Sequence, residues 1–222
     1  MSHDPDFAAR RAAMVRDQIE DRGVHDPRVL QAMREVPRER FVRPGWQAQA
    51  CDDNPLPIEA GQTISQPYIV AFMSEALQLL GSERVLEIGT GSGYAAAVLA
   101  RLAREVHTVE HIALLAEHAG ATLAALGVAN VHVHCADGTL GWPEAAPYDA
   151  IVVTAAGPEV PTALKAQLAV GGRLVMPVGE LDGHQELVRL TRTGEHSEHS
   201  EHREVLMGVR FVPLTGEQGW PR

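Results

Sequence analysis

A glycine-rich turn preceded by an acidic residue is the segment of this sequence best suited to hold a small ligand. Glu87 comes just before a Gly-x-Gly-x-Gly pattern formed by Gly89, Gly91 and Gly93, between an apolar run and an alanine-rich run. Glycine tolerates positive φ angles and lets a ligand approach the backbone closely. In an open α/β sheet, ligands bind at the carboxyl ends of the strands, where such a turn lies. A tight turn that needs glycine only for its backbone is the competing interpretation.

Two further acidic positions favour a nucleoside as the ligand. Glu110 ends the next β-rich run, where a carboxylate can accept hydrogen bonds from both ribose hydroxyls. Asp137, followed by Gly138, comes after the third such run, where its carboxylate can accept a hydrogen bond from an adenine amino group. A lone acidic residue at a strand end is usually only solvated, but acidic residues at three consecutive strand ends outline a nucleoside pocket.

The same turn favours a cationic ligand over a phosphate. A dinucleotide site uses Gly-x-Gly-x-x-Gly and places the pyrophosphate on the helix N-terminus, whereas here the third glycine, Gly93, comes one residue early. Glu87 would repel a phosphate and attract a positive charge. S-adenosylmethionine has an ammonium and a sulfonium and no phosphate. The segment from Glu87 to Gly93, which includes Ser92, therefore resembles motif I of the class I methyltransferases.

Several classes of methyl acceptor are excluded because the sequence lacks the motifs that they require. DNA and RNA amino-methyltransferases carry an Asn/Asp-Pro-Pro-aromatic motif after the fourth strand, and residues 153–158 read Val-Thr-Ala-Ala-Gly-Pro instead. Neither Cys51 nor Cys135 stands in the Pro-Cys context that cytosine methylation requires. A carboxylate trio for a metal-dependent catechol acceptor cannot be assembled, so we expect no metal at the site.

The elements that position these residues are predicted from the alternation of short β-rich runs with Ala- and Leu-rich helical runs. The predicted strands are residues 84–88, 105–109, 130–135, 148–154 and 172–178, and the predicted helices are residues 93–103, 111–126 and 160–169. This alternation indicates an α/β fold with a doubly wound, mostly parallel sheet and helices on both faces. Residues 185–192 and 204–212 are predicted to add a C-terminal antiparallel strand pair at a sheet edge.

The N-terminal part of the chain is predicted to be helical. Over residues 6–35, one helix ends at Gly23 and a second begins with Asp26 as its N-cap and Pro27 in its first turn. Residues 67–80 are predicted to form another helix with one apolar face.

Residues 42–66 are predicted to form an ordered loop, since they are rich in Pro and Gly but also contain Leu56 and Ile64. A long loop inside a compact domain is usually functional or disordered. This loop and other segments resemble the protein-L-isoaspartate O-methyltransferase family, over about residues 14–220 when motif I is included. The segments that carry this resemblance are Val36–Val42, Asp53–Ile58, Gly61–Pro67, Tyr148–Ile151 and Val209–Thr215. The run Gln-Thr-Ile-Ser-Gln-Pro is the most specific of them.

The resemblance implies a fold and a function. The fold would be Rossmann-like, with a seven-stranded sheet whose last strands are permuted relative to other class I methyltransferases. The function would be protein repair, in which a methyl group passes from S-adenosylmethionine to the α-carboxylate of L-isoaspartyl residues in damaged proteins and peptides, and S-adenosyl-L-homocysteine is released. The alternatives are a class I methyltransferase acting on another carboxylate or small molecule, and a cofactor-binding module without turnover.

The resemblance also implies roles for individual residues. Ser65 would be catalytic and would bind the substrate together with Gln62 and Thr63. The implied cofactor-binding residues are Ile64, Glu87, Gly89, Gly91, Ser92, Gly93, Glu110, Asp137, Gly138 and Thr215. An N-cap of the helix after Ser65 is the competing interpretation of this serine. Arg38 and Arg40 fit surface salt bridges as well as they fit a substrate contact.

The sequence departs from the family pattern at three places. Cys51 stands where the family usually has Tyr, Glu59-Ala60 replaces a common Gly-aromatic pair, and Gln218 follows at an unusual spacing. Residues 195–202 form a near-repeat of Glu-His-Ser, which suits either a metal or a solvated hairpin tip. We expect the solvated tip.

Composition and charge restrict the class of protein. The chain has 222 residues and a formal net charge of −10, which disfavours nucleic-acid binding through phosphate contacts. It has no long apolar stretch for a membrane span and no secretory signal at its N-terminus, and two cysteines fit a reducing compartment. We expect a cytoplasmic monomer with one domain over residues 1–222. Its parts would be a helical and substrate-loop segment (1–80), a cofactor-binding core (81–180) and C-terminal strands (181–222).

Overall fold

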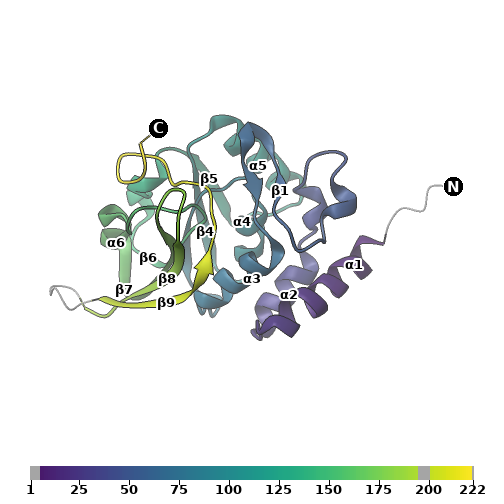
Figure 1. The fold of residues 1–222 in the computed structure, drawn as a ribbon, viewed down its shortest axis with the longest axis horizontal. Helices are drawn as coiled ribbons and strands as arrows, with labels where there is room; N and C mark the ends of the chain where they lie inside the picture. Colours follow the sequence, from purple (N-terminus) through teal and green to yellow (C-terminus); the bar gives the residue numbers. More distant parts are fainter. Residues whose placement is uncertain (1–5, 195–200, 222) are drawn as a thin grey trace.

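A seven-stranded sheet is the centre of the computed structural model, which describes residues 6–194 and 201–221 (Figure 1). The strand order is β5-β4-β3-β6-β7-β8-β9. The strands are β3 (Arg84–Ile88), β4 (Glu105–Glu110), β5 (Val131–Cys135), β6 (Tyr148–Val153), β7 (Leu168–Gly179), β8 (Gln185–Arg192) and β9 (Glu201–Val209). The first five of these strands run parallel, and β8 is antiparallel to both β7 and β9. The predicted mostly parallel sheet with a C-terminal antiparallel pair is confirmed.

Three strand boundaries differ from the prediction by more than two residues. β7 begins at Leu168 rather than at residue 172, and β9 begins at Glu201 rather than at residue 204. β9 ends at Val209 rather than at residue 212, because the following chain leaves the sheet edge and runs beside the turn after β6. There the Leu214 N–H donates to the Ala156 carbonyl at 2.8 Å. This course brings the C-terminal segment to the carboxyl ends of the parallel strands.

The helices follow the predicted order. They are α1 (Phe7–Met14), α2 (Pro27–Glu35), α3 (Pro67–Ala76), α4 (Tyr94–Leu99), α5 (Ala113–Ala125) and α6 (Thr162–Gln167). A π-helical turn and a 3-10 turn continue α1 as far as Gly23, which has a φ of +99°. Asp26 caps α2 as predicted, because its carboxylate accepts from the backbone N–H of Arg28 at 2.8 Å. Two predicted helices are shorter than expected. The helix predicted over 67–80 ends at Ala76, since Gln78 has a left-handed φ of +53°, and the helix predicted over 93–103 ends at Leu99.

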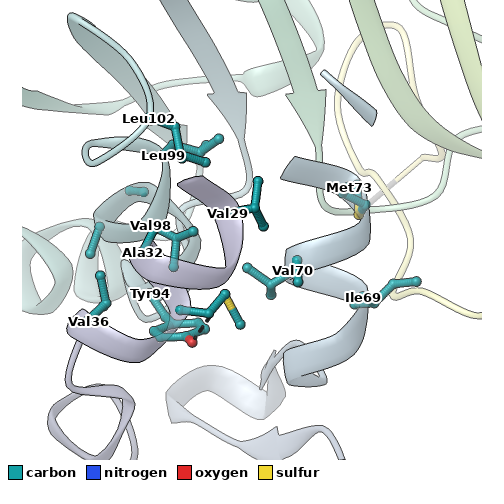
Figure 2. Packing of buried hydrophobic residues seen from close by; sticks show 14 of the residues in the cluster. Val29, Ala32, Val36, Ile69, Val70, Met73, Tyr94, Val98, Leu99 and Leu102 are labelled. Atoms are coloured by element: carbon teal, nitrogen blue, oxygen red, sulfur yellow. Dashed lines mark hydrogen bonds between the residues drawn. The ribbon is translucent and has the colours of Figure 1, made fainter. Parts of the chain in front are cut away.

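The N-terminal helices are fastened to the sheet layer by a hydrophobic cluster (Figure 2). Val29 of α2, Val70 of α3 and Leu99 of α4 are among its buried members. Burying one such side chain contributes about 1.5–3 kcal/mol relative to leaving it exposed. Because α3 packs against α2 and its apolar side chains belong to this cluster, its N-terminus is held in a defined place. That N-terminus follows the Gln-Thr-Ile-Ser segment directly.

The predicted ordered loop is confirmed. Residues 42–66 contain short 3-10 turns and a two-stranded hairpin, in which β1 (Leu56–Pro57) pairs with β2 (Thr63–Ile64). Leu56 and Ile64 face each other in this pairing and are both buried. Among the described residues, no helix is both long and apolar enough to cross a membrane. Residues 195–200 of the Glu-His-Ser stretch lie outside the described residues.

Candidate active site

One cavity of about 550 Å³ lies at the carboxyl ends of β3, β4 and β6, between the start of α3 and the segment that follows β9. Cavities of a few hundred to 1,000 Å³ are typical of small-molecule sites. Most of the residues that the sequence nominates line it, namely Gln62, Thr63, Ile64, Ser65, Gly89, Gly91, Ser92, Glu110, Gly138 and Thr215. The tertiary structure therefore brings the glycine-rich turn and the 62–65 segment to the same cavity.

The glycine-rich turn needs glycine at its first position for two independent reasons. Gly89 has a φ of +93°, and a Cβ there would lie 2.3 Å from the Thr154 hydroxyl oxygen. That hydroxyl donates to the carbonyl of Gly89 at 2.8 Å and ties β6 to the turn. Gly93, in contrast, lies behind the cavity wall, where a Cβ would meet Ala119 and Leu123 of α5. Gly93 does not line the cavity, and its lack of a side chain lets the start of α4 pack on α5.

Glu110 is held in place by backbone donors. One carboxylate oxygen accepts from the Gly91 N–H at 2.9 Å, and the other accepts from the Ile112 N–H at 3.0 Å. The residue is 5% exposed and lines the cavity. Each oxygen keeps a second lone pair, so the oriented carboxylate can still accept hydrogen bonds from a diol in the cavity.

Glu87 lies beneath the cavity rather than in its wall. It is fully buried and accepts a hydrogen bond of 2.5 Å from the Thr108 hydroxyl, which in turn lies 2.6 Å from the hydroxyl of Thr90. Its other oxygen has no hydrogen-bond partner within the described part of the chain. Burial raises the pKa of this carboxyl from 4.5 to about 8. The side chain is therefore mainly neutral at pH 7, and it reaches the cavity only through Thr90, which lines it.

Asp137 is engaged by the C-terminal segment. Its carboxylate accepts from the backbone N–H of Thr139 and from that of Glu217, each at 2.9 Å, and from the Thr139 hydroxyl at 2.6 Å. Asp137 does not line the cavity, whereas Gly138 does. A Cβ at Gly138 would lie 2.5 Å from a side-chain carbon of Ile88, so this strand end packs directly on β3.

Ser65 comes two residues before α3, in the cavity wall. The N-cap of α3 is Gln66, and no side chain caps this helix. The competing interpretation of Ser65 as the N-cap is therefore wrong, because the Gln66-Pro67 step sets the helix start one residue later. The side chain of Gln66 donates instead to the carbonyl of Asp53 at 3.0 Å, which ties the 62–66 segment to the preceding loop.

Arg38 is a buried anchor of this segment. Its guanidinium donates to the carbonyls of Ala50 and Ser65, each at 2.8 Å, and lies over the ring of Tyr94 at 4.7 Å. Arg38 is 0% exposed, so the surface salt-bridge interpretation is wrong for this residue. Burial lowers the pKa of its guanidinium. Arg40 is exposed and does not line the cavity.

Sequence reasoning missed several residues of the cavity. His111 follows Glu110, and one of its ring nitrogens lies 3.5 Å from the Thr215 hydroxyl, so these two side chains meet across the opening. The exposed side chains of Arg22 and Arg210 also line the cavity. The only available signal was their position beside nominated segments. Gln218, whose role was open, accepts from the backbone N–H of Ala163 at 3.1 Å and so secures the start of α6.

Comparison with known proteins identifies the family. A family model described as Protein-L-isoaspartate(D-aspartate) O-methyltransferase (PCMT) matches residues 9–219. The chain is similar to "Protein-L-isoaspartate O-methyltransferase 1" of Rhodopseudomonas palustris (strain HaA2), with 63% identity over 96% of this chain and 86% of the relative. It is also similar to "Protein-L-isoaspartate O-methyltransferase 2" of Marinobacter nauticus, with 59% identity over 97% of both chains.

Solved structures agree with this assignment. A structure named protein-L-isoaspartate O-methyltransferase matches with a TM-score of 0.83 and 30% identity, over 96% of this chain and 67% of that chain. A Plasmodium falciparum structure, solved in complex with S-adenosyl-L-homocysteine, matches with a TM-score of 0.78 over 92% of this chain and 98% of that chain. At 24% identity this second match supports the fold alone. The chain belongs to the protein-L-isoaspartate O-methyltransferase family.

Proposed function

We propose that the cavity is the place where this chain transfers a methyl group from S-adenosylmethionine to the α-carboxylate of an L-isoaspartyl residue. Membership of the family makes the chain an S-adenosylmethionine-dependent methyltransferase that acts on isoaspartyl residues in damaged proteins and peptides. The observation that supports this cavity as the site is that the glycine-rich turn, Glu110 and the 62–65 segment all line it. The methyl donor and the acceptor carboxylate could therefore bind in the same cavity.

The roles of the cofactor-side residues follow from their positions. The turn from Gly89 to Ser92 would receive the methionine part of the cofactor, and Glu110 would accept from its ribose hydroxyls. Gly138 and Thr215 would border the adenosine part, because they lie at the adjoining strand end and on the C-terminal segment. Asp137 and Glu87 would act indirectly, the first by holding the C-terminal segment and the second by orienting Thr108 and Thr90.

The methyl transfer requires alignment of the reacting groups and does not require a general base. The acceptor carboxylate has a pKa of about 4 and is already ionised at pH 7. S-adenosylmethionine, when bound, would supply a methyl group that its sulfonium has already activated. The residues of the cavity would then only need to place one carboxylate oxygen in line with the methyl carbon and the sulfur. Holding two reacting groups in such an arrangement can supply about 7–11 kcal/mol in favourable cases. The enzyme's own residues would therefore orient the carboxylate, exclude water and leave its attacking oxygen free.

Ser65 is the residue proposed to orient the carboxylate, together with Thr63 and Gln62. Since the Ser65 hydroxyl is not consumed in capping α3, it is available to donate to a substrate oxygen. Arg38 holds the Ser65 carbonyl and so limits the movement of this segment. Arg210 lines the cavity and would supply positive charge for a carboxylate-bearing peptide on a chain whose formal net charge is −10. Arg22 also lines the cavity, but its guanidinium is paired with Asp53 and lies over the ring of Tyr68.

The test of this function uses two peptides that differ only in L-isoaspartate against L-aspartate. The methyl group of labelled S-adenosylmethionine should pass to the isoaspartyl peptide and not to the aspartyl peptide. Calorimetry in the same preparation establishes that the cofactor binds. Cofactor binding without methylation of either peptide would refute the acceptor and leave the cofactor site in place.

The remaining expectations concern the state of the chain. We propose that it works as a single-domain monomer in the cytoplasm. The absence of a membrane-crossing helix from the described residues agrees with this proposal. Sedimentation of the purified chain, with and without cofactor, tests the oligomeric state.

A further inference from the structure

Three potential metal ligands gather on β4 and β5, outside the cofactor cavity. Glu105 and His107 are alternate residues of β4, so their side chains share one face of the sheet, and His132 is the register partner of His107 on β5. The two strands lie side by side at one edge of the sheet (Figure 1). None of the three side chains lines the cavity.

The spacing of the donor atoms matches a metal centre. One carboxylate oxygen of Glu105, Oε1, lies 3.3 Å from Nε2 of His107 and 3.5 Å from Nε2 of His132. A tetrahedral zinc ion with bonds of about 2.0–2.1 Å separates its ligand atoms by roughly 3.3–3.4 Å. All three donor atoms lie within 4.8 Å of one another. One ion can therefore reach them with small side-chain rotations.

His107 is the buried member of the cluster. The residue is 8% exposed, and its Nε2 makes no hydrogen bond of good geometry among the described residues. The polar atom that it faces is Oε1 of Glu105, 3.3 Å away, so the buried nitrogen is directed into the cluster. Its other nitrogen, Nδ1, lies 3.0 Å from Nε2 of His134. When Nδ1–H donates there, the Nε2 lone pair is left for a metal. Histidine ligands of metals commonly donate their second ring N–H in this way.

Neighbouring residues hold the ligands in this arrangement. The ring of His134 stacks on Trp142, with centroids 3.9 Å apart, which fixes the partner of His107. Arg84 donates to Oε2 of Glu105 at 2.8 Å and leaves the other oxygen of this carboxylate for the cluster. The side chain of His132 is 47% exposed and provides a route of entry from solvent.

We propose that Glu105, His107 and His132 bind one divalent transition-metal ion, Zn²⁺ being the best match, with solvent in the fourth position. Imidazole and carboxylate donors suit zinc. The ion would join β4 to β5. In the described part of the chain β5 is an edge strand of the sheet and is hydrogen-bonded to β4 only. The site is separate from methyl transfer, and its role would be to stabilise the cofactor-side strands against opening at this edge.

The experiment measures Zn²⁺ binding to the full chain without an affinity tag. The Glu-His-Ser stretch is a competing binder, so His196, His199 and His202 are first replaced by Ser, and this background is titrated with zinc chloride. We expect one equivalent to bind and to raise the Tm. Co²⁺ in the same background should give the visible absorption bands of a four-coordinate ion.

Variants in that background assign the ligands. His132→Ala and Glu105→Gln, at exposed and half-buried positions, should each weaken zinc binding by at least tenfold and abolish the cobalt bands. His184→Ala is the matched control, because His184 is an exposed histidine 3.6 Å from Glu186 on β8. Its binding should be unchanged. The proposal would be overturned if the chain with the three His→Ser replacements bound no zinc. It would also be overturned if His132→Ala and Glu105→Gln both bound zinc as tightly as that chain.

Discussion

Replacing the buried Glu87 by Gln should remove a loss of folding stability that grows as the pH rises from 4.5 to about 8. In the folded chain the pKa of Glu87 is raised from 4.5 to about 8, because burial disfavours the charged carboxylate. Below pH 4.5 the carboxyl is protonated in both the folded and the unfolded state. Between pH 4.5 and 8 the folded state alone keeps the proton, so its stability falls as pH rises. Gln is a neutral side chain of the same shape and has no such dependence.

The magnitude follows from the two pKa values. Each pKa unit is worth about 1.4 kcal/mol, so the interval from 4.5 to about 8 corresponds to about 5 kcal/mol once the carboxyl is charged in both states. At pH 7 the lost contribution is about 3 kcal/mol by the same constant. In Glu87→Gln the amide oxygen can still accept from Thr108, so this hydrogen bond is kept.

The assay is urea unfolding of the wild type and Glu87→Gln at pH 6, 7 and 8. The difference in unfolding free energy should grow in favour of the variant by about 1 kcal/mol per pH unit. Glu117→Gln, which replaces an exposed carboxylate on α5, is the control and should leave the slope unchanged. Parallel pH dependences for the wild type and Glu87→Gln would refute the assignment of a buried, neutral carboxyl.

Four further substitutions test the proposed site. Ser65→Ala should lower kcat/KM for the isoaspartyl peptide by more than about tenfold, from one lost hydrogen bond to a charged group, with cofactor affinity by calorimetry kept within a few-fold; an unchanged kcat/KM removes Ser65 from the mechanism. Glu110→Ala should weaken S-adenosylmethionine binding by about tenfold or more in calorimetry, and wild-type affinity would contradict the ribose assignment. Gly89→Ala should lower both stability and cofactor affinity, since its Cβ would lie 2.3 Å from the Thr154 oxygen, whereas Gly120→Ala, with open space around it, should not. Arg38→Lys should reduce the unfolding free energy by about 1–3 kcal/mol and lower kcat, because one ammonium cannot reproduce the two-sided donation to the Ala50 and Ser65 carbonyls; wild-type values of both would show that the anchor is dispensable.

Several features of the fold could be predicted because short stretches of sequence dictate them. The cap at Asp26 and the stop at Gly23 depend on a few adjacent residues, and both are present. The alternation of strands and helices also follows from local pattern, so a mostly parallel sheet was predictable. The end of β9 was not predictable, because it depends on a pairing between Leu214 and Ala156 that periodicity does not contain.

The candidate site divides in the same way. The glycine-rich turn and Glu110 were nominated from spacing along the chain, and both line the cavity. Their roles toward the cofactor stay predictions. The sequence could not show that Glu87 is sealed beneath Thr90, since burial depends on what packs over a strand from elsewhere in the chain.

The sequence by itself determined the class of sheet, the glycine-rich turn and the family resemblance, because each is encoded in contiguous residues with characteristic types and spacing. Only the tertiary structure decided which distant groups meet. Arg38 reaches the Ser65 carbonyl, and the Asp137 carboxylate accepts from the Glu217 N–H. His107 faces His132 across two strands in the same way. These contacts join residues separated by 25 to 80 positions. The packing of the whole chain, and not the local sequence, brings these partners together.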